Sequence, residues 1–125
     1  MTRVKALRES LKRELGRVCG IPFGDESARP TAKPPFGVCS LLLMQQQENW
    51  DVYDLFVNIS DYSPDEEMVD ALSETVLEHL KDLDYFGEDG TSWSAYDVKC
   101  RPIESADKNI RQRRISAIIK YYRKD

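Results

Sequence analysis

The stretch DVYDLFVNISDYSPDEEMVDALSETVLEHLKDLDY, residues 51–85, decides the fold because it changes from a strand pattern to a helix pattern within a few residues. In residues 51–60 every second side chain is apolar, and this alternation predicts a β-strand with one buried face. From residue 69 onward the apolar side chains recur at three- and four-residue steps, which predicts an amphipathic helix running to about Tyr85. The strand face consists of Tyr53, Leu55, Val57 and Ile59, and the helix stripe of Val69, Leu72, Val76, Leu80 and Leu83.

The start of this helix is marked by capping chemistry. Ser63 stands at the N-cap position, Pro64 in the first turn and Glu66 at the capping-box position. Acidic side chains follow at the end where the helix dipole is positive. The sequence therefore predicts a helix that begins near Ser63.

The segments that precede residue 51 predict a helix, a loop and a strand. Apolar residues at helical spacing, between basic ones, indicate an amphipathic first helix over about residues 4–18. Residues 21–35 hold four of the six prolines and predict a long loop, with room for one extra short strand. Residues 36–44 predict a buried strand, and the polar residues 45–49 connect it as a hairpin to residues 51–60.

The segments that follow the acidic helix predict a second pair of strands. Residues 87–90 form a turn, residues 93–103 a third strand, and residues 113–123 a final strand with alternating apolar residues. The order helix, strand, strand, helix, strand, strand predicts an α+β fold. We expect a mostly antiparallel sheet of four or five strands with both helices packed on one face.

Length and composition indicate one ordinary globular domain over residues 1–125. Hydrophobic residues make up 41% and charged residues 32%, and no apolar run approaches the roughly 20 residues that cross a bilayer. The cysteines Cys19, Cys39 and Cys100 are widely spaced, which favours reduced thiols in a cytosolic setting. We expect no membrane attachment.

Charge is distributed unevenly along the chain. Residues 61–89 contain eleven Asp or Glu residues against a single lysine, Lys81. Residues 1–20 carry six Lys or Arg with two Glu, and residues 99–125 carry nine Lys or Arg with three acids. Such a chain offers complementary surfaces, which favours self-association or docking in an assembly.

No arrangement of residues predicts an enzyme. His79, the single histidine, lies beside the apolar stripe of the acidic helix, so we interpret it as a boundary or surface residue. The carboxylates lack a calcium-loop motif, and phosphate-binding glycine motifs are absent. We therefore expect no catalytic residues, no cofactor and no metal site.

Two further clusters have competing interpretations. The basic C-terminal cluster with Tyr121 and Tyr122 could contact nucleic acid, but the chain is acidic overall, with a pI of about 5.1, which disfavours that role. Trp50 and Trp93 stand at strand starts and are candidate anchors of a subunit interface, or alternatively fillers of the core at the sheet edge.

The order of these features resembles the tail terminator and head-to-tail joining proteins of long-tailed bacteriophages. The resemblance covers about residues 4–123 and rests on the short first helix, the Pro-rich stretch leading into residues 34–38, the strand over residues 50–60, the capped acidic helix and the closing strands. It implies a small α/β virion structural protein that forms a hexameric ring at the head-proximal end of the tail tube. The implied partners are other copies of the chain, the tail tube protein and the head connector, with DNA as passing cargo. The implied location is the virion tail or neck, and the host cytoplasm during assembly.

The resemblance and the charge pattern together give candidate interface residues. A ring needs a heterologous interface, so we expect Arg111, Arg113 and Arg114 to face Asp65, Glu66 or Glu67 of a neighbouring subunit. The projecting docking loops would contain Asp25, Glu26, Arg29 and Lys33 in one segment, and Gln45, Gln46 and Gln47 in the other.

An alternative class is a small acidic binding module, such as an inhibitor or immunity-type protein. Its carboxylate-rich helix would dock on a basic protein surface, and the chain would stay monomeric.

Overall fold

The computed structural model describes residues 3–24, 35–62, 66–103 and 109–122. Two helices and six strands follow one another along the chain: α1 (Arg3–Cys19), β1 (Phe23–Gly24), β2 (Phe36–Gln46), β3 (Trp50–Asp61), α2 (Glu67–Leu80), β4 (Asp84–Phe86), β5 (Ser92–Ile103) and β6 (Arg111–Tyr122). The strands form one sheet in the order β1-β2-β3-β6-β5-β4. Among the strands of the described residues, β1 and β2 are parallel and every other neighbouring pair is antiparallel.

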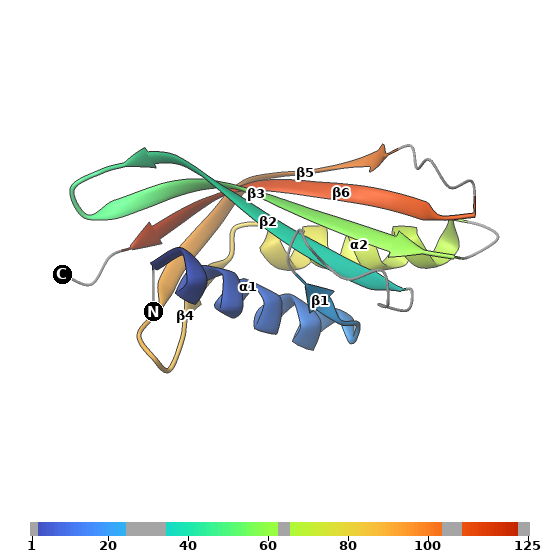
Figure 1. Cartoon of the computed structure of the whole chain (residues 1–125), viewed down its shortest axis with the longest axis horizontal. Coiled ribbons are helices and arrows are strands. Elements are labelled where there is room, and N and C mark those ends of the chain that lie inside the picture. The colour runs from blue at the N-terminus through green and yellow to red at the C-terminus, as the bar shows by residue number, and fades with distance from the viewer. Residues whose placement is uncertain (1–2, 25–34, 63–65, 104–108, 123–125) are drawn as a thin grey trace.

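The molecule has two layers, a curled sheet and a pair of helices (Figure 1). Both helices lie on the same face of the sheet, and the opposite face carries no helix from the described part of the chain (Figure 1). The α+β class, the mostly antiparallel sheet and the placement of both helices on one face therefore agree with the sequence-based prediction.

The predicted number and order of strands were wrong in detail. The four long strands are present, and β1 is the extra short strand for which the predicted loop over residues 21–35 left room, whereas β4, which follows α2, was not predicted. The predicted connector over residues 45–49 is shorter than expected, because β2 continues to Gln46.

Helix α2 ends earlier than predicted. It stops at Leu80, and Asp82 then adopts a positive φ of 56°, which no helix continues through. The N–H of Ala95 donates to the carbonyl of Leu83 at 2.9 Å, so the chain joins the sheet at the point where a further helical turn was expected.

The predicted cap of α2 is also displaced. Ser63, Pro64 and Asp65 lie outside the described residues. Glu66 occupies the N-cap position itself and makes no side-chain capping hydrogen bond. Glu66 is therefore not a capping-box residue in the third position of the helix.

The core lies between the sheet and the helices. The alternating apolar residues of β3 and β6 are buried, and the apolar stripes of α1 and α2 meet them. These buried side chains are Tyr53, Leu55, Val57 and Ile59 of β3, Ile115, Ala117, Ile119 and Tyr121 of β6, Leu7, Leu11 and Leu15 of α1, and Val69, Leu72, Val76 and Leu80 of α2. Burial of such side chains at about 25 cal/mol per Å² of apolar surface is the main force that holds the helices on this face.

Trp93 belongs to this core and is not an interface anchor. Its side chain is 1% exposed, and its ring stacks on Tyr85 with 5.0 Å between the centroids. Its indole N–H donates to Ser10 Oγ at 3.0 Å, and Ser10 Oγ donates to the carbonyl of Leu7. The core-filling interpretation of Trp93 is thus confirmed, and its assignment to a subunit interface was wrong.

Candidate assembly surfaces

The basic end of β6 contacts the acidic start of α2 within the same chain. Arg113 Nε donates to Asp70 Oδ1 at 3.0 Å, and its Nη2 lies 2.8 Å from Glu66 Oε2. The Arg113 side chain is only 11% exposed, whereas both carboxylates are more than half exposed. Glu66, which was predicted as a partner of Arg113 across a subunit interface, and Asp70, which was not predicted, therefore contact Arg113 within one chain.

The neighbouring arginine points to the open face of the sheet. Arg114 Nε donates to Asn58 Oδ1 at 2.9 Å, and its guanidinium lies 5.2 Å from the centre of the Phe56 ring. Arg111 is half-buried at the start of β6. Of the three acidic residues predicted to oppose these arginines, Glu66 and Glu67 are exposed and Asp65 lies outside the described residues.

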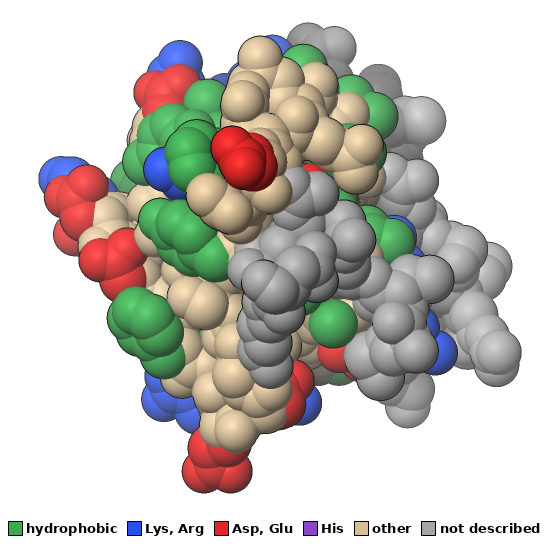
Figure 2. Space-filling view, turned by 90° about the vertical axis from the view of Figure 1, so that its left-hand side faces the viewer, with side chains coloured by type: hydrophobic (Ala, Val, Ile, Leu, Met, Phe, Trp, Pro, Cys, Tyr) green, Lys and Arg blue, Asp and Glu red, His purple; other side chains and the backbone are tan. Residues whose placement is uncertain are grey.

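The charge separation of the sequence is only partly retained on the surface. Glu67, Glu74 and Glu78 of α2 are exposed, so the helix presents an acidic outer side. On the end of the molecule shown in Figure 2, however, Lys or Arg and Asp or Glu side chains lie next to one another. The surface is not simply divided into an acidic pole and a basic pole.

The open face of the sheet carries aromatic rings beside cations. Lys120 Nζ lies 4.0 Å from the centre of the Trp50 ring and 5.6 Å from that of Tyr122. The Tyr122 hydroxyl lies 3.2 Å from Ser94 Oγ, which donates to Asp84 Oδ1 at 2.6 Å. Trp50 is half-buried here, so it keeps the position expected of an interface residue, although its ring already contacts a cation of its own chain.

The hairpin of β2 and β3 extends past the ends of both helices (Figure 1). On it Leu42, Leu43 and Met44 are 58%, 45% and 53% exposed. Leu42 is aligned with Asp54 and Leu43 with the buried Tyr53, so these two side chains lie on opposite faces of the hairpin. In Figure 2, which faces this end of the molecule, green apolar side chains lie in separate groups among polar and charged ones.

The structure describes one of the two segments that were predicted to be docking loops. Gln45 and Gln46 are exposed at the end of β2, and Gln47 is exposed in the turn, where its N–H donates to the carbonyl of Trp50 at 2.8 Å. Asp25, Glu26, Arg29 and Lys33 lie outside the described residues.

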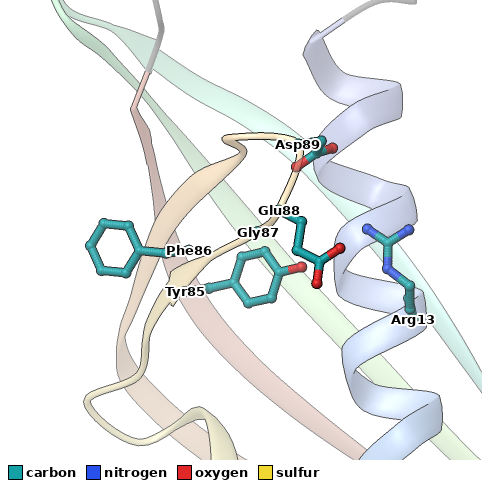
Figure 3. A pocket seen from close by; sticks show the side chains of 6 residues that line it. All are labelled: Arg13, Tyr85, Phe86, Gly87, Glu88 and Asp89. Carbon is teal, nitrogen blue, oxygen red and sulfur yellow. The ribbon is translucent and has the colours of Figure 1, made fainter.

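Sequence reasoning missed a hollow of about 490 Å³ between α1 and the turn after β4. Figure 3 shows that Glu88 and the Tyr85 hydroxyl point towards Arg13 of α1, whereas Phe86 points away. Phe86 is 79% exposed, the highest value among the exposed large apolar side chains. The acidic turn was recognised in the sequence, but its proximity to a basic residue of α1 depends on tertiary packing.

His79 lies at the boundary between the two helices. Its Nε2 is 2.9 Å from Glu14 Oε1, and Arg17 also donates to that carboxylate. The hydrogen bond from Arg17 is the main cause that lowers the pKa of Glu14, and the hydrogen bond from His79 adds to it. The His79 side chain is 23% exposed, between core and surface, which agrees with its interpretation as a boundary or surface residue.

The three cysteines lie in different environments. Cys39 is buried, Cys19 is half-buried and Cys100 is exposed, and all three are free thiols. Burial raises the pKa of the Cys19 and Cys100 thiols. Among the described residues, no three or more His, Cys, Asp or Glu side chains gather where they could hold a metal ion.

Comparisons with known proteins show the fold alone. No protein-family model and no curated protein sequence matches this chain. One solved structure, whose name describes no function, is similar with a TM-score of 0.66 at 9% sequence identity, covering 97% of this chain and 94% of that chain. Within the described ranges, no helix has the length and apolar character that crossing a membrane requires.

Proposed function

We propose that this chain is a structural subunit of a ring that closes the tail tube of a long-tailed bacteriophage or joins that tail to the head connector. The observation that carries the proposal is the projecting β2–β3 hairpin with Leu42, Leu43 and Met44 exposed. A small domain gains nothing in stability from apolar side chains left in water, and a neighbouring subunit would cover those of the hairpin on assembly.

The resemblance to tail terminator and head-to-tail joining proteins supplies the specific role. The two-layer α+β architecture fits the small α/β subunit that the resemblance implies. The partners in this proposal are other copies of the chain, in a ring of six, together with the tail tube protein or the head connector. The protein would act in the virion tail or neck, without catalysis.

Native mass spectrometry of the purified chain tests the ring, because a subunit of this kind assembles to a closed oligomer at high concentration. Adding the chain to purified tail tubes then separates the two roles. A terminator caps tubes at a fixed length, whereas a neck-joining protein binds only the portal-connector complex. A chain that stays monomeric and binds neither structure would contradict the proposal.

The alternative proposal, an acidic inhibitor or immunity-type module, is favoured by the exposed carboxylates Glu67, Glu74 and Glu78 of α2. Such a module would be monomeric and would bind a basic protein with an affinity that falls steeply as salt is raised. Neutralising these three residues to glutamine would abolish that binding, whereas a ring held by the hairpin would still assemble.

A further inference from the structure

Strand β2 is a long sheet edge that carries neither charge nor proline, although its ladder with β3 shifts register between Leu43 and Gln45. Its only outer neighbour, β1, pairs with Gly37 and Val38, so residues 39–46 have no strand on that side among the described residues. Its sequence, FGVCSLLLMQQ, contains no charged residue and no proline. Natural proteins protect long exposed edges with charges, prolines or short strands, because an unprotected edge pairs with another chain.

Strand β5 provides a second, different free edge on the other side of the sheet. Strand β4 pairs only with residues 92–94, and the carbonyl of Leu83 accepts the N–H of Ala95. Residues 96–103 therefore have no outer strand in the described part of the chain. This segment carries Lys99, Arg101 and Pro102, and its ladder with β6 is interrupted between Tyr96 and Lys99, so it resists pairing with an identical edge of another copy.

We propose that the free edge of β2 pairs with the free edge of β5 in a second copy of this chain, so that the ring is built by strand addition. The inference rests on the proposed function and names the interface that holds the ring. A pairing of two different edges is heterologous, and heterologous contacts are the kind that generate rings.

The direction of the strands suits this pairing. Strands β2, β3, β6 and β5 are antiparallel in succession, so β2 and β5 run in opposite directions. If a second copy is related to the first by rotation about an axis roughly parallel to the strands, the β5 strand of one copy runs antiparallel to the β2 strand of the other. Antiparallel ladders have slightly better hydrogen-bond geometry per residue than parallel ones.

The positions of the two free segments also fit. Strand β6 serves as the common reference for the two edges. Gly37 of β2, which pairs with β1, lies level with Arg113 of β6. Ser94 of β5, which pairs with β4, lies level with Lys120 of β6. The covered parts therefore lie at opposite ends of the sheet, and the free parts are diagonal to one another. Joining them requires a stagger between copies, as the closing of any curved sheet does.

Charge selects this pairing over the pairing of two β5 edges. Two β5 edges would bring Lys99 and Arg101 against their own copies, and directly opposed like charges are unfavourable. The β2 edge carries no cation, and Asp54 of β3 lies directly across from Leu42, one strand behind that edge. Pro102 lacks an N–H, so the proposed ladder has one donor fewer than its length suggests.

The first test compares two substitutions of the same kind on the full chain. Leu42→Lys places a cation on the β2 edge, and Met68→Lys places one on α2, where the side chain is 47% exposed and no free edge is present. We expect wild type and Met68→Lys to form the same oligomer by sedimentation velocity, and Leu42→Lys to assemble at least ten times more weakly. Far-UV circular dichroism establishes that each variant is folded.

The outcomes separate this inference from the proposed function. If Leu42→Lys assembles as tightly as wild type, the β2 edge is not the interface, and the ring itself stands. If wild type remains monomeric at every concentration, the proposed function fails and the interface fails with it.

Cross-linking tests which edge is the partner and does not depend on Leu42→Lys folding. In a Cys100→Ser background, a short thiol-reactive cross-linker is applied to Leu42→Cys, Arg101→Cys and the double variant. The pairing of β2 with β5 predicts a ladder of oligomers for the double variant and no cross-linked dimer for either single variant. A dimer from Leu42→Cys alone would show two-fold pairing of β2 with itself, and an assembled ring that yields no ladder would also overturn the inference.

Discussion

Replacing Trp93 with phenylalanine tests whether this side chain stabilises the core or contributes to a subunit interface. The indole is 1% exposed, stacks on Tyr85, and donates a hydrogen bond of 3.0 Å to Ser10 Oγ. Loss of that hydrogen bond costs about 1 kcal/mol. The smaller ring adds on the order of 1 kcal/mol through the space it leaves. We therefore expect Trp93→Phe to lower the free energy of unfolding by about 2 kcal/mol.

A double-mutant cycle with Ser10→Ala isolates the hydrogen bond. Ser10→Ala leaves the indole N–H buried without its acceptor, which costs about 1–3 kcal/mol. Once Trp93 is phenylalanine, that penalty disappears. The double variant should therefore be more stable than the sum of the single effects predicts, by about 1 kcal/mol.

Urea unfolding followed by far-UV circular dichroism measures these differences at a concentration where the chain does not assemble. Trp50→Phe is the matched control, because Trp50 is half-buried and its ring contacts Lys120 at the surface. We expect this control to change the free energy of unfolding by less than about 0.5 kcal/mol. If Trp93→Phe leaves the unfolding midpoint unchanged and weakens assembly instead, the assignment of Trp93 to the core is wrong.

Three further predictions follow from local geometry. Gly37→Ala would place its methyl carbon 2.3 Å from a ring carbon of Phe23, so it should cost about 1–3 kcal/mol in urea unfolding, whereas Gly16→Ala, with no contact below 3.5 Å, should be neutral or stabilising. The folded-state pKa of Glu14 lies below its ordinary value of 4.5, so its contribution to stability is present above pH 4.5 and is lost as the pH falls through the folded-state pKa. The melting temperatures of Glu14→Gln and wild type should therefore converge in acid, as thermal melts across that pH range would show. Cys100 should be alkylated by iodoacetamide in the folded chain, and the buried cysteine of β2 only on unfolding, as peptide mass mapping would reveal.

The long elements could be predicted because each is marked by its own periodicity. The alternation in residues 51–60 and 113–123 comes from packing on one face of a sheet, and it survives in the structure as the buried residues of β3 and β6. The apolar stripe of α2 was equally clear, but it continued to Leu83, and the helix does not. The departure at Asp82 is tied to the stacking of Tyr85 on Trp93, a contact between two segments that no local pattern in either one indicates.

Glu66 was named as a partner of Arg113, but on another copy of the chain, and the second partner, Asp70, was not named. The sequence shows that an arginine of this strand and the acids of the helix could attract one another, without showing whether they meet in one chain or between two. The answer depends on the register of β6 against β3, which aligns Arg113 with Ile59 and places it near Asp70. A charge pattern therefore predicts complementary surfaces more reliably than it predicts which copy supplies each one.

The β2 segment shows how topology changes the meaning of the same residues. As a sequence, residues 36–44 indicate only a buried strand, because apolar runs without charge are typical of strands covered on both sides. The sheet order places this strand next to an edge that β1 covers at two residues only, and the hairpin carries its far half beyond the helices (Figure 1). A sequence suited to a central strand thus occupies a position that is open in the single chain. The conflict is removed if another strand covers it, and Leu42→Lys tests that, because a charge introduced on a sheet edge disfavours the addition of a further strand.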